Sequence, residues 1–253
     1  MVSKRDLLDA AAMARDVSRG PARARRIRLA TRHARPRAPA HYTAAMNKAD
    51  ALGFVLAAVA RLITGAQGHW KGVPPKAEQR IYFANHQSHL DWVLIWATLP
   101  ADLRAQTRPI AAADYWTTTP LKHWLTREVF RAVYVDRERK EGGPDPLEPL
   151  VAALEQGDSL VIFPEGTRSN KGMPQDFKSG IFRLAKQFPH VQLIPCWIDN
   201  VQRVMPKGEV VPVPILCTVT FGAPCNLGAD EPKADFLARA RDAVIALKPG
   251  GSA

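Results

Sequence analysis

The sequence predicts an α/β fold in which a mostly parallel, mixed sheet is flanked by helices on both faces and preceded by an N-terminal helical segment. Three observations lead to this fold class. From about residue 78 onward, short apolar runs alternate with helical patterns, which is typical of a parallel sheet covered on both faces. Two polar runs directly follow apolar runs, as expected where sites form at the carboxyl ends of strands. The apolar content of 46% and the charged content of 23% are those of an ordinary globular domain.

Strands and helices are expected in alternation along this part of the chain. The apolar runs predict strands over residues 80–84, 108–112, 131–135, 159–163, 191–197 and 213–221. The helical patterns predict helices over residues 90–99, 119–129, 146–156, 178–187 and 232–247. A chain of 253 residues is long enough for one sizeable domain with an appendage. We therefore expect one main domain over residues 73–250.

The N-terminal residues 1–45 form a basic arm. They hold eleven Lys or Arg against three Asp, a net charge of +8 out of +11 for the whole chain. A solvated tail is one interpretation of such a run. Contact with the anionic surface of a bilayer is another, because each basic residue near that surface contributes about 1 kcal/mol. Nucleic acid is a third, but the arm has no interleaved aromatic residues, so no specific nucleic-acid partner is expected.

Residues 46–72 follow as an amphipathic helical segment. Within residues 51–66 the apolar side chains have helical spacing and form one stripe, made of Leu52, Val55, Leu56, Val59, Leu62 and Ile63. Sixteen residues that include Arg61 fall short of the ~20 needed to cross a bilayer. The segment is therefore expected either to lie in a membrane interface or to pack on the main domain as a hairpin partner or core helix.

The cysteines and the chain start limit the compartment and the chemistry. Cys196, Cys217 and Cys225 lack metal-ligand spacing, and an odd number of cysteines without a secretory signal indicates free thiols in a reducing compartment. No long apolar region follows the first residues, so no signal peptide is expected. The sequence also contains no zinc pattern and no Gly-rich phosphate loop. No metal and no bound cofactor are expected.

The first polar run, residues 85–91 (Asn-His-Gln-Ser-His-Leu-Asp), contains a candidate base with its carboxylate. In a regular helix, residues five apart point about 140° away from each other. His86 and Asp91 therefore meet only if His86 lies on the turn after the strand and Asp91 lies just inside the next helix. Asp91 would then fix the tautomer of the imidazole, and the other ring nitrogen would face a substrate hydroxyl. Ser88 is expected to cap the helix, and His89 is expected to be structural.

The second polar run, residues 163–169 (Phe-Pro-Glu-Gly-Thr-Arg-Ser), contains a candidate phosphate ligand on a tight turn. Gly166 permits a positive φ or a close approach of the backbone to a ligand. Arg168 has the planar fork that suits phosphate oxygens. Glu165 would repel a phosphate, so it is expected to hold Arg168 or a substrate hydroxyl. Alone, this run indicates an ordinary turn with a solvated Arg; together with the first run, it indicates deprotonation of a hydroxyl on a phosphate-bearing substrate.

At these residues the chain resembles the glycerolipid acyltransferase superfamily, most closely the 1-acylglycerol-3-phosphate (lysophosphatidate) acyltransferases. Three weaker runs add to the resemblance: residues 133–137, a strand ending in Arg137; residues 177–180, which contain Lys178; and residues 193–198, a strand with a Pro. The family often has Gly six residues before the Arg, where this chain has Arg131. Cys196 is expected to fill the core.

The resemblance implies an O-acyltransferase and assigns roles to these residues. His86 and Asp91 would be catalytic. The substrate-binding residues would be Glu165, Gly166, Thr167, Arg168 and Arg137, with Lys178 either near the phosphate or simply exposed. The acyl group would come from acyl-CoA or from acyl carrier protein, as a co-substrate. It would pass to the free hydroxyl of 1-acylglycerol 3-phosphate, which gives phosphatidate.

The resemblance also implies a location and leaves alternatives. The enzyme would be peripheral or monotopic on the cytoplasmic face of a membrane, with membrane lipids as partners. The acceptor could instead be glycerol 3-phosphate or another lysolipid, because the motifs are shared across the superfamily. A non-catalytic membrane-binding protein on this scaffold is a further alternative, against which the intact His86 and Asp91 argue. The aromatic residues between 114 and 130 suit a membrane interface, the mouth of an acyl-chain tunnel or an ordinary core.

Overall fold

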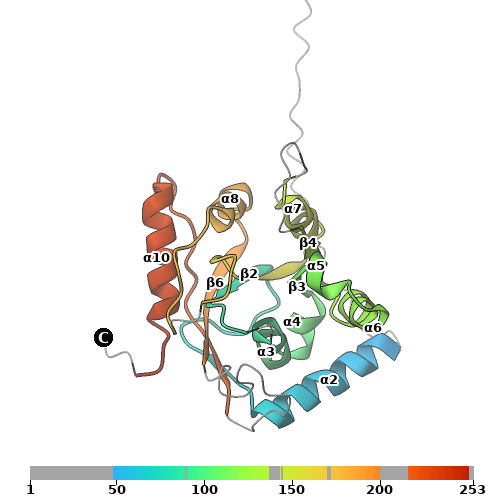
Figure 1. Cartoon of the computed structure of the whole chain (residues 1–253). Coiled ribbons are helices and arrows are strands. Elements are labelled where there is room, and N and C mark those ends of the chain that lie inside the picture. The colour runs from blue at the N-terminus through green and yellow to red at the C-terminus, as the bar shows by residue number, and fades with distance from the viewer. Residues whose placement is uncertain are drawn as a thin grey trace, which may run out of the picture. The chain divides into compact units, whose positions relative to one another are not determined.

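A seven-stranded sheet forms the centre of the structure (Figure 1). The computed structural model describes residues 48–88, 90–136, 143, 145–169, 172–199 and 216–250. The strand order is β1-β7-β6-β2-β5-β3-β4. The strands are β1 (Gln67–Trp70), β2 (Arg80–Ala84), β3 (Thr107–Ala112), β4 (Val133–Val135), β5 (Ser159–Ile162), β6 (Gln192–Asp199) and β7 (Thr218–Phe221).

The sheet is parallel except for one pair of strands. β2 pairs in parallel with β5 on one side and with β6 on the other, while β6 and β7 are antiparallel. Every residue of β2 and β5 is buried, as expected for parallel strands covered on both faces. The mostly parallel, mixed sheet predicted from the sequence is confirmed.

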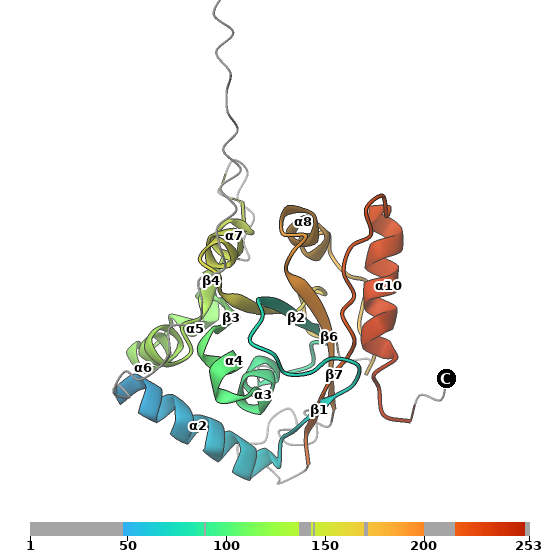
Figure 2. The same cartoon turned by 180° about the vertical axis from the view of Figure 1, so that it is seen from behind.

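Helices cover the two faces of the sheet in separate layers (Figures 1 and 2). The helices are α2 (Lys48–Thr64), α3 (Asp91–Thr98), α4 (Ala101–Ala105), α5 (Ala113–Trp116), α6 (Pro120–Trp124), the π-helix η1 (Leu125–Val129), α7 (Glu148–Glu155), α8 (Gly180–Gln187) and α10 (Lys233–Ile245). Successive residues of a strand point to opposite faces. Accordingly Tyr82 joins a cluster with α2 and α3, whereas Ile81 and Phe83 join a cluster with α7, α8 and α10.

The structure departs from the sequence prediction at β1, α4 and α5, which were not expected, and at residues 119–129, which divide into α6 and η1. β1 (Gln67–Trp70) lies in the segment expected to be helical, but it pairs with β7 at the edge of the sheet. The sheet therefore begins within the segment that was expected to be helical. The four residues of β1 lack apolar alternation and are mostly exposed. They pair with residues 218–221, which lie far along the chain, so no local pattern within residues 67–70 identifies the strand.

Helix α2 packs one face against the domain and exposes the other. Ala57 is buried against the cluster that contains α3. Arg61 donates from Nε to the carbonyl of Ala97 at 2.5 Å, which joins α2 to the carboxyl end of α3. The opposite face exposes large apolar side chains, namely Phe54, Val55, Val59 and Leu62. The expected single stripe is thus split, because several of its members point away from the protein. Across the residues described, no helix has the length and apolarity to span a bilayer.

Several predictions fall outside the described residues. They concern the basic arm over residues 1–45, the phosphate-binding role of Arg137, the structural role of His89 and the start of the last strand at residues 213–215. These predictions stay open.

Candidate active site

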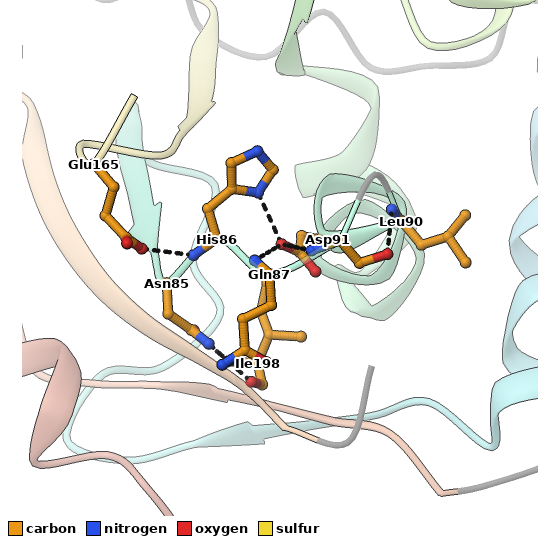
Figure 3. A network of polar contacts seen from close by, with 8 residues as sticks. Asn85, His86, Gln87, Leu90, Asp91, Glu165 and Ile198 are labelled. Carbon is orange, nitrogen blue, oxygen red and sulfur yellow. Dashed lines mark hydrogen bonds and ion pairs between the residues drawn. The ribbon is translucent and has the colours of Figure 1, made fainter. Parts of the chain in front are cut away.

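The end of β2 is fixed to β6 by Asn85, the first residue of the first polar run. Its side-chain amide donates from Nδ2 to the carbonyl of Ile198 at 3.0 Å and accepts the Ile198 N–H at Oδ1 over 2.8 Å (Figure 3). Asn85 is 1% exposed, so these bonds form away from competing water. The turn that carries His86 therefore leaves the sheet from a fixed point.

His86 and Asp91 form the expected pair. The distance from Nδ1 of His86 to Oδ2 of Asp91 is 2.8 Å, with His86 on the turn and Asp91 as the first residue of α3 (Figure 3). The same oxygen accepts the backbone N–H groups of Gln87 at 2.6 Å and Ser88 at 2.8 Å. Three donors thus converge on one buried carboxylate oxygen, which fixes the Asp91 side chain in place.

The imidazole of His86 has its second nitrogen available. The ring stacks on Phe163 with a centroid distance of 4.2 Å and an interplanar angle of 15°. Nε2 points away from Asp91 (Figure 3) and bonds to none of the residues that the structure describes. With Nδ1–H donating to Asp91, Nε2 carries the lone pair. This is the arrangement of a general base with its orienting carboxylate.

Glu165 has a different place from the one expected. Its carboxylate does not bind Arg168, and both of its oxygens already accept backbone N–H groups instead of facing a substrate hydroxyl. Oε1 accepts the His86 N–H and Oε2 accepts the Gln175 N–H, both at 2.8 Å. The residue is 2% exposed, and burial raises the pKa of its carboxyl, while the two backbone N–H groups oppose that rise. In addition, Ser169 donates its N–H to the His86 carbonyl at 2.8 Å. The second polar run therefore holds the backbone of His86 at both its N–H and its carbonyl.

The raised pKa of Glu165 predicts a specific pH dependence of stability. A carboxyl whose folded pKa lies above its ordinary value of 4.5 contributes stability that is complete below that value and is lost as the pH rises through the folded pKa. We expect the free energy of unfolding of the wild type to fall relative to Glu165→Gln over this range, by at most about 1.4 kcal/mol per pH unit. Urea unfolding of both proteins as a function of pH measures this difference. The prediction is contradicted if the free energy of unfolding of the wild type, relative to that of Glu165→Gln, stays constant or rises with pH.

The turn after β5 brings Gly166 and Lys178 together. Gly166 has a φ of +67°, where a residue with a Cβ is strained. The backbone N–H of Lys178 donates to the Pro164 carbonyl at 2.8 Å, and a Cβ built on Gly166 would lie 2.7 Å from Nζ of Lys178. The ammonium group therefore lies across the glycine. Thr167 and Arg168 are exposed on the same turn, and Arg168 forms no ion pair with the residues described here.

Several contributors to the site were not identified from the sequence. Phe163 supports the imidazole and Ser169 holds its backbone. A hollow of about 480 Å³ adjoins the turn, and Arg241 of α10 lines it. An Arg on an amphipathic helix has the same local pattern as a solvated residue, so no signal in the sequence distinguished it.

The site residues that the structure describes do not form a metal centre. Among them, no group of three His, Cys, Asp or Glu side chains is placed to hold a metal ion. Cys196 is fully buried in β6, and burial raises the pKa of its thiol. A buried thiol with a raised pKa is a poor nucleophile, so the expectation that Cys196 fills the core is confirmed.

Comparison with known proteins gives relatives that share this part of the chain. The chain is 30% identical over 138 residues to the human 1-acyl-sn-glycerol-3-phosphate acyltransferase alpha. The matched stretch covers 53% of this chain and 46% of the human protein. It is 26% identical over 181 residues to the 1-acyl-sn-glycerol-3-phosphate acyltransferase of Limnanthes douglasii, which covers 69% and 60%. The chain thus spans about half the length of the mammalian relatives it matches.

A solved structure and a family model place the chain more broadly. The crystal structure of the 1-acyl-sn-glycerophosphate (LPA) acyltransferase PlsC from Thermotoga maritima superposes with a TM-score of 0.59 at 21% identity, over 80% of this chain and 81% of that one. At this identity the likeness shows a shared fold. The family model described as Acyltransferase matches residues 70–199, which contain both polar runs and half of the chain. The chain therefore belongs to the acyltransferase family.

Proposed function

We propose that this protein is an O-acyltransferase that moves an acyl group from an acyl thioester to the free hydroxyl of 1-acylglycerol 3-phosphate. The observation that carries the proposal is the His86–Asp91 pair at 2.8 Å, whose second imidazole nitrogen is available beside a turn with Arg168 and Lys178. A base next to cations suits a substrate that has both a hydroxyl and a phosphate. The names of the relatives point to the same acceptor.

In the proposed reaction the acceptor oxygen attacks the thioester directly. Nε2 of His86 takes the proton from the hydroxyl as the oxygen bonds to the carbonyl carbon. Asp91 accepts the Nδ1–H throughout and stabilises the imidazolium that forms. When the tetrahedral intermediate collapses, the carbon–sulfur bond breaks and the thiol leaves with the proton from His86. The products are phosphatidate and the free thiol of the carrier.

Cations in and near the second run position the acceptor. Arg168 offers its planar fork to the phosphate oxygens, and Lys178 adds a point charge across Gly166. Arg137 is proposed as a third ligand. Holding the phosphate places the hydroxyl next to Nε2, which turns an encounter in solution into a reaction between fixed groups. The donor is proposed to be acyl-CoA or acyl carrier protein, as a co-substrate and not as a bound cofactor.

A panel of acceptors tests the proposed substrate. The purified protein is supplied with oleoyl-CoA and, in separate reactions, with 1-oleoylglycerol 3-phosphate, glycerol 3-phosphate and lysophosphatidylcholine. We expect the highest kcat/KM for 1-oleoylglycerol 3-phosphate, because only this acceptor combines an apolar chain with a phosphate monoester. A higher kcat/KM for glycerol 3-phosphate would favour the alternative that the protein is a glycerol 3-phosphate acyltransferase. Absence of transfer from both CoA and acyl carrier protein donors to all three would favour the non-catalytic alternative.

We propose a peripheral or monotopic place on the cytoplasmic face of a membrane, and the exposed face of α2 supports the membrane contact. Phe54 is 60% exposed and Leu62 is 83% exposed on this face, and Leu121 of α6 is also exposed, at 71%. Exposed apolar residues gathered on one helix are typical of an interfacial helix. A substrate that is itself a membrane lipid gives such a helix a function.

Replacing Leu62 by Glu is expected to weaken binding to vesicles of phosphatidylcholine and phosphatidate by at least about tenfold, because one buried Leu contributes roughly 1.5–3 kcal/mol. Co-sedimentation of the full chain with the vesicles measures the effect. Ala238→Glu is the matched control, since Ala238 is exposed on α10, which covers the other face of the sheet (Figure 1), and the substitution adds the same charge. Equal binding by wild type and Leu62→Glu would contradict the assignment of this face.

A further inference from the structure

The hollow beside the second polar run is lined by residues from two parts of the chain. Its volume of about 480 Å³ lies within the range of small-molecule sites. Three residues that were predicted to bind substrate line it, namely Glu165, Thr167 and Lys178. The loop over residues 173–176 and Arg241 of α10 complete the lining. The hollow therefore adjoins the turn that carries Arg168, and it extends from this turn to α10.

Two cations of the lining are fixed in place. Lys178 lies across Gly166, so its ammonium group is confined against the backbone of the turn, and it pairs with no carboxylate among the described residues. Arg241 donates from Nε to the carbonyl of Pro174 at 3.1 Å. That bond uses one edge of the guanidinium and leaves the terminal nitrogens for another acceptor.

The two carboxylates near Arg241 pair only weakly with its guanidinium group. Asp176 lies 3.9 Å from Nε and is fully exposed, and Asp242 lies 3.9 Å from NH1 with 74% of its side chain exposed. Solvated pairs at this separation contribute little to stability. Asp176 nevertheless lines the hollow, so its charge would oppose the binding of an anion there.

Other arginines of this part of the chain are closely paired. Arg239, on the same helix, donates to both oxygens of Glu231 at 2.7 and 2.6 Å and to the carbonyl of Asn226 at 2.8 Å. The hydrogen bonds from Arg239 and from the Gly228 N–H lower the pKa of Glu231 to about 2. Arg183 donates to both oxygens of Asp145. Arg241 thus differs from its neighbours in having a fixed position without a close carboxylate, as expected for a residue that binds a ligand.

We propose that Lys178 and Arg241 together bind a phosphate group of a substrate in this hollow. The proposal rests on the proposed function for the identity of the substrates. Two sources have this chemistry: the headgroup of the lysolipid acceptor and the phosphates of the donor's carrier. Arg241 supplies a planar fork and Lys178 a point charge, and the two cations come from segments that only the fold brings together.

Binding of an inorganic probe tests the site without any acyl transfer. The full chain is titrated calorimetrically with inorganic pyrophosphate at low salt. Arg241→Gln and Lys178→Met are each expected to weaken binding by about five- to tenfold, since each removes a charge-assisted contact at a partly exposed site. Asp176→Asn is expected to strengthen binding. Lys233→Gln, at the exposed start of α10, removes the same charge away from the hollow and is expected to stay within about twofold of the wild type.

Unchanged affinity in both Arg241→Gln and Lys178→Met, or absence of pyrophosphate binding by the wild type, overturns the site. If pyrophosphate binding responds as expected but no acceptor is acylated, the site stands and the proposed function fails. The response of Asp176→Asn shows whether the probe occupies the hollow, because removing a carboxylate from the lining strengthens the binding of an anion that lies there. An unchanged affinity in this variant would contradict the site.

Steady-state kinetics of Arg241→Gln then identify the source of the phosphate. A KM that rises for 1-oleoylglycerol 3-phosphate alone, with kcat nearly unchanged, assigns the hollow to the acceptor headgroup. A rise confined to oleoyl-CoA assigns it to the donor's carrier. A fall in kcat with both KM values unchanged would show that Arg241 only supports the loop at Pro174, and it would overturn its role as a ligand.

Discussion

Replacing His86 by Ala is expected to lower kcat for acyl transfer by about 10²–10⁴, the usual contribution of a general base. The folded structure should survive, because the contacts of His86 with Glu165 and Ser169 use only its backbone. The loss should therefore appear in kcat while the circular dichroism spectrum and the thermal midpoint stay close to those of the wild type. Transfer from oleoyl-CoA to 1-oleoylglycerol 3-phosphate measures the effect.

The control for this substitution is His190→Ala. His190 is exposed before the amino end of β6, whereas the site lies at the carboxyl ends of the strands. Its replacement should leave kcat within about twofold of the wild type, as for an ordinary surface change. A folded His86→Ala variant that retained a tenth or more of the wild-type kcat would rule out His86 as the base.

Replacing Asp91 by Asn is expected to lower kcat by a similar factor, about 10²–10⁴, because the orienting carboxylate of a base contributes through charge and tautomer together. An Asn oxygen can still accept the N–H groups of Gln87 and Ser88, but the negative charge that stabilises the imidazolium is lost. The amide nitrogen would take the place of Oδ1, which is buried and has no hydrogen-bond partner in the described structure. A buried donor without an acceptor costs about 1–3 kcal/mol, so the thermal midpoint should also fall.

Kinetics separate these two consequences of Asp91→Asn. Measured below its unfolding range, the variant should have a low kcat and a nearly unchanged KM for the lysolipid, because Asp91 does not bind the phosphate. Asp235→Asn is the matched control, since Asp235 lies in the first turn of α10 and is exposed. A normal kcat in Asp91→Asn would show that the carboxylate serves only to fix the start of α3.

Much of the fold could be predicted because the central strands are encoded locally. The apolar runs at β2 and β5 are buried on both faces, so their composition alone identifies them. β1 was missed for the opposite reason, since this edge strand is polar and mostly exposed. The exposed face of α2 shows a similar limit. Its helical spacing was visible, but which part of the stripe α3 would cover depends on how closely the two helices approach.

The His86–Asp91 pair was predictable because it is local. His86 and Asp91 lie five residues apart, and a strand, a turn and a helix start leave few ways to arrange them. The role of Glu165 was not predictable in the same way. Its partners His86 and Gln175 belong to two different loops. A Glu three residues before an Arg suggests an ion pair between the two side chains, and the structure does not form that pair.

The sequence by itself determined the α/β class, the positions of the two polar runs after buried strands, and the pairing of His86 with Asp91. These follow from composition, periodicity and short-range geometry. Only the tertiary structure decided that Asn85 is fixed to Ile198, that Glu165 holds the backbone of His86, and that Arg241 lines the hollow beside Lys178. Such contacts depend on strand order and loop packing, which bring together residues that are far apart in the chain.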